Sequence, residues 1–259
     1  MKIIIKQCSF GDVQHLMREY LHALSSPFDS FLENHILSST YYMIFEETKE
    51  IGYYAIYHHE LLTQFYIHQS FQMHSQRLFN QVLEQHSIKS LFVPTCDELF
   101  ISLSLDHEFI IERQAYFFQD SQKDLNVSDV RIDEVFRPAN LEDLQTIQHI
   151  CGDFLNNYEE SITSGQLFAY YRGPELLGIG IVERSKMFEK LGSIGMFTNG
   201  AFRQQGVGRT IIMQLRKWCN QQGMKPISGC WYYNEASKRT LESAGMVTKT
   251  RLLNMKTTS

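Results

Sequence analysis

The same order of predicted elements occurs twice along the 259 residues of this chain. Each half begins with a strand, a turn and a helix, continues with a strand hairpin, and then alternates helices with strands. The last helices also agree in spacing, because Asp97 lies 12 residues before Phe109 and Asn234 lies 12 residues before Met246. We interpret this order as a divergent internal duplication; the alternative is a chance similarity between two α/β halves.

A polar segment without apolar periodicity separates the two halves. We therefore predict a first domain over residues 1–121, a linker over 122–130 and a second domain over 131–259. The predicted hairpins pair 41–45 with 51–57 in the first half and 167–171 with 177–182 in the second.

The composition limits the class of protein. Hydrophobic residues make up 43% of the chain and charged residues 20%, which excludes a disordered, collagen-like or coiled-coil chain. No apolar stretch is long enough to span a membrane, and three apolar residues before Lys6 are too few for a signal peptide. The cysteines are odd in number and form no C-x-x-C motif, so we expect reduced thiols in a cytoplasmic protein: Cys8, Cys96, Cys151, Cys219 and Cys230.

The net charge of −5 is unevenly distributed. The first 125 residues carry 16 acidic and 8 basic residues, whereas the remainder carries 13 acidic and 16 basic ones. Either the halves have different histories, or the basic half holds an anionic ligand. This modest positive charge disfavours nucleic acid as a partner.

A glycine-containing turn follows the strand that ends near Thr198 and precedes an amphipathic helix that begins near Gly208. It reads Arg203-x-x-Gly206-x-Gly208. Glycines allow the main-chain N–H groups to line one concavity, and a helix start adds about +0.5 of an elementary charge. The turn therefore predicts a diphosphate site, although an ordinary strand-to-helix turn is the alternative. Arg216 and Lys217, on the same helix, are expected to face solvent.

This turn resembles motif A of the GNAT acetyltransferase superfamily, Gln/Arg-x-x-Gly-x-Gly/Ala. Two further features are similar to that family: Arg137-Pro138-Ala139 with Asp143 near the start, and Asn234 followed by Gly245-Met246, which resembles motif B. The resemblance covers 131–259. It implies a mixed α/β (α+β) fold class with two tandem GNAT-like domains, each a mostly antiparallel mixed sheet flanked by helices.

The resemblance implies acetyl-CoA as cosubstrate and no metal. The pantetheine arm would pair with the fourth strand of the domain, and the pyrophosphate would lie on the glycine turn. The residues implied in cofactor binding are Met196, Phe197, Thr198, Arg203, Gln204, Gln205, Gly206, Val207, Gly208, Arg209, Thr210, Asn234 and Ser237.

Direct acyl transfer to an amine needs a base, an oxyanion donor and an acid for the thiolate. The sequence departs from the family at the acid, because Leu241 stands where many members have a tyrosine, and the fourth strand has no carboxylate. Glu183 is the candidate base and Tyr232 the candidate acid. A solvated glutamate and a core tyrosine are the alternatives. Cys230 is expected to be a buried thiol.

The first half departs further. Its segment 71–77 contains no glycine, and Asp97 replaces the motif B asparagine, so we expect a degenerate domain without a CoA site. A metal site at His58-His59-Glu60 is not expected, because adjacent residues of a strand point to opposite faces.

These features together predict an N-acetyltransferase acting on an amine of a small molecule or peptide. The alternatives are a CoA-responsive sensor or scaffold without activity, and an enzyme using another donor, such as a longer acyl-CoA or an aminoacyl-tRNA. The acidic first half suits a cationic acceptor such as a polyamine or an aminoglycoside. No membrane partner is expected, and both a monomer and a homodimer stay open.

Overall fold

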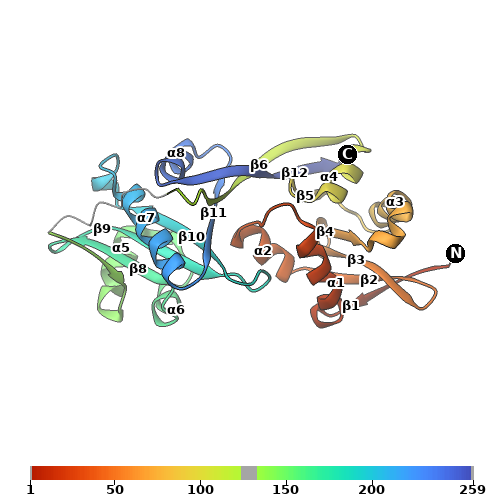
Figure 1. Ribbon diagram of the computed structural model, residues 1–259, viewed down its shortest axis with the longest axis horizontal. Coiled ribbons are helices and arrows are strands. Elements are labelled where there is room, and N and C mark those ends of the chain that lie inside the picture. The colour runs from red at the N-terminus through yellow and green to blue at the C-terminus, as the bar shows by residue number, and fades with distance from the viewer. Residues whose placement is uncertain (1, 124–132, 258–259) are drawn as a thin grey trace. The chain divides into compact units, whose positions relative to one another are not determined.

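The computed structural model describes residues 2–123 and 133–257, and its chain divides into two compact units (Figure 1). Unit 1 comprises residues 1–117 and 250–259, and unit 2 comprises 118–249. The division differs from the predicted domains at the carboxy terminus, since residues 250–259 group with the first half. Most of the predicted linker lies outside the described residues.

Unit 1 is built on a mixed sheet. Antiparallel pairs join its first four strands in chain order, the fifth strand is parallel to the fourth, and the end of β12 is antiparallel to the fifth. The strands are β1 (Ile3–Cys8), β2 (Thr40–Glu46), β3 (Lys49–Tyr57), β4 (Leu61–Ile67), β5 (Ser90–Pro94) and β6 (Phe109–Asp120).

Unit 2 repeats this arrangement. Its first four strands are again joined in chain order by antiparallel pairs, and the fifth is parallel to the fourth. This confirms the predicted fold class. The strands are β7 (Glu134–Pro138), β8 (Leu167–Arg172), β9 (Glu175–Arg184), β10 (Leu191–Thr198), β11 (Lys225–Trp231) and β12 (Met246–Thr257).

The helices also correspond between the units. Unit 1 has α1 (Phe10–Ala23), α2 (Ser30–Leu37), η1 (Gln69–His74), α3 (Ser75–Gln85) and α4 (Glu98–Leu105). Unit 2 has η2 (Leu141–Asp143), α5 (Leu144–Cys151), η3 (Gly152–Phe154), α6 (Tyr158–Thr163), η4 (Gly200–Phe202), α7 (Val207–Gln221) and α8 (Glu235–Ser243). No helix among the described residues is long and apolar enough to cross a membrane.

Local sequence explains where these helices begin and which face they bury. Ser9 and Asp12 form a capping box at the start of α1, with the Ser9 N–H donating to Asp12 Oδ2 at 2.8 Å. Val13, Leu16 and Tyr20 then follow helical spacing and are buried.

Helix α7 lies directly on the sheet of unit 2. Its buried residues Ile211 and Leu215 face glycines of β9, and a Cβ at Gly180 would lie 2.9 Å from Ile211 Cγ2. Glycine on the strand therefore allows close helix–sheet packing, which fixes the position of the helix start.

Two strands pass from one unit into the other. Strand β12 begins in unit 2, and its residues from Thr250 onward belong to unit 1. Leu252 and Met255 are fully buried there, and Met255 lies in the core of unit 1. Strand β6 passes the opposite way, entering unit 2 at Phe118. Each unit therefore includes a strand segment from the other half of the sequence.

Candidate functional site

Strands β10 and β11 are paired only at their start. Parallel pairs run from Leu191–Lys225 to Ser193–Ile227, and in the described part of the chain the ladder between these strands stops there. The Ser228 hydroxyl then donates to the Ile194 carbonyl at 2.7 Å. We call the region beyond this bond the fork; it consists of residues 195–198 of β10 and 229–231 of β11.

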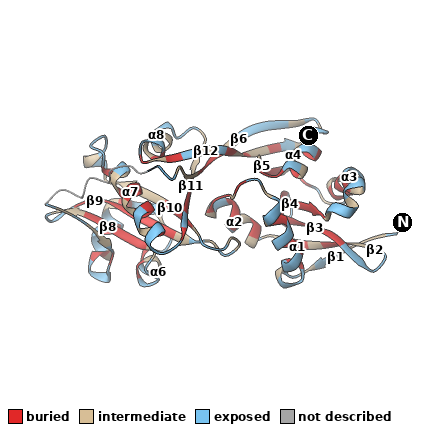
Figure 2. Cartoon of the chain, in the orientation of Figure 1, coloured by how far each residue is buried: buried red, intermediate tan, exposed pale blue. Residues whose placement is uncertain are grey.

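The fork leaves main-chain groups of β10 without a neighbouring strand. The Ile194 carbonyl points toward β11, because it accepts the Ser228 hydroxyl. Alternate residues of a strand direct their main-chain groups to the same side, so the N–H of Met196 also points toward β11, past the end of the ladder. Residues 195–198 are half-buried, which leaves them within reach of a ligand (Figure 2).

The predicted glycine turn joins β10 to α7. Gln204 and Gly206 have positive φ angles of 62° and 84°. Gly206 is the N-cap of α7 and offers no side-chain cap, so the first N–H groups of the helix have no partner from the cap residue. The predicted helix start is confirmed to within one residue, since α7 begins at Val207.

Gly208 holds the helix start against the fork. A Cβ at this position would lie 3.1 Å from Thr198 Oγ1, 3.2 Å from Met196 Sδ and 3.2 Å from Thr240 Cγ2. The three contacts come from β10 and α8, so a small residue here brings the amides of α7 close to both elements.

The side chains around the turn have different surroundings. Arg203 is exposed, and Gln205 Nε2 donates to the Ala201 carbonyl at 3.4 Å. Arg209 Nε donates to the Ser243 carbonyl at 3.0 Å, which ties this side chain to the end of α8. The N–H of Thr210 bonds to the Gly206 carbonyl within the first turn. Arg203 is therefore the cation of the turn that extends into solvent.

Asn199, which the sequence analysis did not single out, anchors this turn. Its Nδ2 donates to the Leu176 carbonyl at 2.8 Å, and its Oδ1 accepts the Ala201 N–H at 3.1 Å. An asparagine followed by glycine after a strand is the signal that could have identified it.

Asn234 is the N-cap of α8, as Asp97 is of α4. Asn234 Oδ1 accepts the Ser237 N–H at 3.0 Å, and Asp97 Oδ1 accepts the Phe100 N–H at 2.9 Å. The two positions are therefore structurally equivalent, in agreement with the predicted duplication. Because the carbonyl of the Asn234 amide is used by the helix, its Nδ2 is the group that can reach a ligand.

The two candidate catalytic residues lie on different elements. Glu183 is half-buried on β9 and pairs in register with Ser193, the last residue of β10 that is paired with β11. Tyr232 follows β11 directly, with its ring 5.2 Å from that of Tyr233. Leu241, at the position of the usual family tyrosine, is buried on α8.

Arg216 is buried, so the expectation of a solvent-facing side chain was wrong. Its guanidinium donates to the Ala244 carbonyl and forms an ion pair with Asp120. A buried cation requires such partners, and both lie far from Arg216 in the sequence. The bond to Ala244 fixes the end of α8 against α7.

In unit 1 the region that corresponds to the fork is buried. The parallel ladder of β4 and β5 ends at Leu62–Leu91, but β4 is buried along its whole length (Figure 2). Helix η1 leads directly into α3, and the Ser75 N–H bonds to the Gln72 carbonyl. The amide that starts α3 is therefore already used.

The segment 58–60 lies in the turn between β3 and β4 rather than on a strand. His58 and His59 have positive φ angles of 47° and 64°. These residues therefore do not alternate between the two faces of a sheet, as the sequence analysis expected. Among the described residues no group of three or more His, Cys, Asp or Glu side chains is arranged to hold a metal ion.

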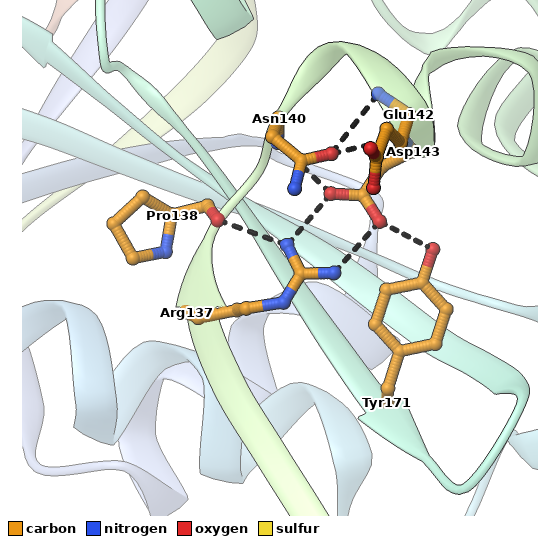
Figure 3. Close-up of polar contacts among 6 residues, drawn as sticks. All are labelled: Arg137, Pro138, Asn140, Glu142, Asp143 and Tyr171. Atoms are coloured by element: carbon orange, nitrogen blue, oxygen red, sulfur yellow. Dashed lines mark hydrogen bonds and ion pairs between the residues drawn. The ribbon is translucent and has the colours of Figure 1, made fainter.

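A polar cluster fixes the start of unit 2 (Figure 3). Both terminal nitrogens of Arg137 donate to the Asp143 carboxylate, at 2.7 and 2.8 Å, and Tyr171 donates to it at 3.0 Å. The hydrogen bond from Arg137 is the main cause that lowers the pKa of Asp143. The cluster connects β7 and β8 to the start of α5.

Residues 9–121 match the family model of the acetyltransferase (GNAT) domain. The whole chain is similar in structure to an acetyltransferase of the GNAT family from Colwellia psychrerythraea, with a TM-score of 0.89 and 20% identity over 98% of this chain and 100% of that one. The chain as a whole has the fold of GNAT acetyltransferases, and its residues 9–121 match the GNAT domain model. The match to the family model falls on unit 1, whose segment 71–77 contains no glycine.

Two other solved GNAT structures have the same fold. A GCN5-related N-acetyltransferase from Sphaerobacter thermophilus has a TM-score of 0.67 and 11% identity, covering 98% of this chain and 95% of that one. A tandem GNAT protein of the clavulanic acid biosynthesis pathway has a TM-score of 0.65 and 10% identity, covering 99% and 98%. No curated protein matches the sequence.

Proposed function

We propose that this GNAT protein transfers an acetyl group from acetyl-CoA to an amine, using one cofactor site in unit 2. The observation that carries the proposal is the start of α7, where a left-handed glycine cap leaves main-chain N–H groups without a side-chain partner at the end of the fork. Such N–H groups and the helix dipole favour a diphosphate.

The predicted cofactor residues fit this ligand in distinct ways. The amides of residues 204–208 would hold the pyrophosphate, and Arg203 would add a positive charge. The main chain of residues 196–198 would pair with the pantetheine arm in the place of a neighbouring strand. Asn234 Nδ2 would donate to an amide carbonyl of that arm. Acetyl-CoA supplies the thioester carbon that the amine attacks.

The transfer needs three groups from the chain. The amine nitrogen bonds to the thioester carbon, the C–S bond breaks, and the amine proton passes through water to Glu183. The Met196 N–H is the oxyanion donor, because it points into the fork. Tyr232 returns a proton to the thiolate. Unit 1 would then be a degenerate domain without CoA, because its segment 71–77 contains no glycine and β4 is buried along its whole length.

A CoA-binding sensor without activity is the second candidate. It is favoured by the buried Leu241 and by β10, which carries no carboxylate. The five cysteines, all among the described residues, form no disulfide there, which supports a cytoplasmic protein for either candidate.

Calorimetric titration with acetyl-CoA, followed by thiol release with a panel of amines, tests both candidates. We expect a stoichiometry of one per chain and turnover with at least one amine. Gly206→Ala strains the positive φ by about 1 kcal/mol and weakens binding, whereas Gly206→Asn tolerates this conformation and serves as the matched control. Tight binding without turnover would favour the sensor, and two sites per chain would contradict the single-site proposal.

A further inference from the structure

Helix α7 covers one face of the sheet of unit 2, and α5 lies on the other face. Ile179, Ile181 and Phe197 pack in one core cluster with residues of α5. The register of β9 and β10 places Glu183 and Gly195 on the same face. We call this the acceptor face, because it lies opposite the glycine turn and α7.

Strand β11 extends the acceptor face across the fork. Ile227 pairs with Ser193, which shares the face of Gly195, so alternation places Gly229 and Trp231 there as well. On this face Gly195 of β10 and Gly229 of β11 leave both sides of the fork without a side chain. Phe197 and Trp231 are the next residues of the two strands that point to this face. On this face the fork therefore has no side chains at its two glycines and has aromatic rings at its open end.

Several aromatic rings beside the fork are exposed. In unit 2 the exposed aromatic residues of the described chain are Phe154, Trp231 and Tyr233, at 39%, 58% and 55%. The Phe154 ring lies 5.3 Å from that of Phe197, and the Trp231 ring lies 5.1 Å from that of Tyr233. The exposed aromatic surface of unit 2 thus gathers as one pair on each side of the fork.

We propose that the acceptor is an amine carried on a flat aromatic or apolar body, which binds between these two aromatic pairs. This inference rests on the proposed acetyl transfer. Aromatic rings and cationic amines both interact favourably with exposed ring faces. Glu183, at the closed end of the fork, lies on the same face and attracts the ammonium group. A linear polyamine would leave most of this aromatic surface in water.

Tryptophan fluorescence measures acceptor binding without requiring turnover. The chain has two tryptophans, and Trp218, half-buried against Phe168, can be changed to phenylalanine so that Trp231 alone reports. We expect saturable quenching of Trp218→Phe by phenethylamine, with and without CoA, and none by butylamine or spermidine. Equal or tighter binding of spermidine overturns the inference.

Kinetics with substituted chains provide the second test. Trp231→Ala should raise KM for phenethylamine about tenfold, whereas Trp231→Phe should restore most of the affinity and butylamine kinetics should not change. Calorimetric affinity for acetyl-CoA should be the same in all three chains. An unchanged phenethylamine KM in Trp231→Ala contradicts the inference.

The two proposals fail in different ways. If acetyl-CoA does not bind but phenethylamine still quenches Trp231, the acetyltransferase proposal fails and the aromatic site stands. If acetyl-CoA binds and spermidine is acetylated in preference to phenethylamine, the acetyltransferase proposal stands and the aromatic acceptor is wrong.

Discussion

Gly52 and Gly178 occupy equivalent positions in the two units. A Cβ on Gly52 would lie 2.2 Å from the Tyr66 carbonyl oxygen, and one on Gly178 would lie 2.3 Å from that of Phe197. Tyr66 and Phe197 are therefore equivalent, and two residues earlier Gln64 corresponds to Gly195. Gln64 is fully buried, with Nε2 3.4 Å from Met17 Sδ. Unit 1 has an amide side chain where unit 2 has none.

Gly195→Gln should therefore close the fork of unit 2. A Cβ at this position lies 3.1 Å from Ile181 Cγ2, so the new side chain has no room inside the sheet and must extend over the acceptor face. We expect kcat/KM for the amine to fall at least tenfold, with a smaller change in acetyl-CoA affinity. Steady-state kinetics and calorimetry measure both. Gly195→Ala is the control, and an equally active Gly195→Gln would show that the acceptor approaches elsewhere.

Two substitutions at Gly208 distinguish the effect of side-chain volume on acetyl-CoA affinity from the effect of side-chain charge. Its neighbours within 3.2 Å are side-chain atoms of Met196, Thr198 and Thr240, which can move by a few tenths of an ångström. Gly208→Ala should therefore lower acetyl-CoA affinity only a few-fold. Gly208→Asp adds a carboxylate beside the expected diphosphate and should abolish binding in calorimetry. Similar affinities for these two variants would exclude the turn as the diphosphate site.

Local patterns were sufficient to predict the hairpins and the helix start near Gly208, whereas the fold class came from the resemblance to the GNAT superfamily. Glycines, apolar periodicity and turn residues act over short distances, so the sequence displays them directly. The ion pair between Arg216 and Asp120 joins residues 96 positions apart. In the sequence alone, the charged side chain of Arg216 on an amphipathic helix is therefore indistinguishable from a solvent-facing one. The aromatic acceptor face was also missed, because it depends on which face of the sheet α5 and α7 each cover.

The exchange of strand segments was equally invisible in the sequence, and it gives a stability prediction. Met255 is fully buried in the core of unit 1, although it lies in the last strand of the chain. Met255→Ala should destabilise unit 1 by about 2–5 kcal/mol, as for other large-to-small core changes. Urea unfolding of the full chain measures this, with the nearby exposed Lys256→Ala as the control. Equal loss in both variants would argue against a core role.

A fragment of residues 1–121 provides an independent check of the same exchange. It lacks the strand segment that pairs with β5, where Leu252 to Lys256 face Pro94 to Ser90. We expect this fragment to show no cooperative unfolding alone, because one side of β5 and the core site of Met255 stay open. Joining residues 250–257 to the fragment should restore a cooperative transition in circular dichroism. A stable fragment without them would contradict this prediction.

Asp97 makes the stability of unit 1 depend on pH. Its carboxyl is 5% exposed, and burial raises its pKa to about 7, although the Phe100 N–H bond to Oδ1 opposes this shift. The charged form is therefore less stable in the folded chain than in the unfolded one, where the pKa is about 3.9. The contribution of Asp97 to stability should be constant below pH 4, fall between pH 4 and 7, and level off above pH 7.

Asp97→Asn should remove this fall. Asparagine keeps the Oδ1 acceptor that caps α4 and cannot ionise, and it is the residue that unit 2 has at the equivalent position, Asn234. We expect the variant to be more stable than the natural chain at pH 8, on the order of 3 kcal/mol, with little difference at pH 4. Urea midpoints at pH 4, 6 and 8 measure the effect. Asn234→Asp is the reciprocal control: this cap is exposed, so its carboxylate stays hydrated and the midpoints should follow those of the natural chain. Parallel pH profiles for Asp97→Asn and the natural chain would contradict the prediction.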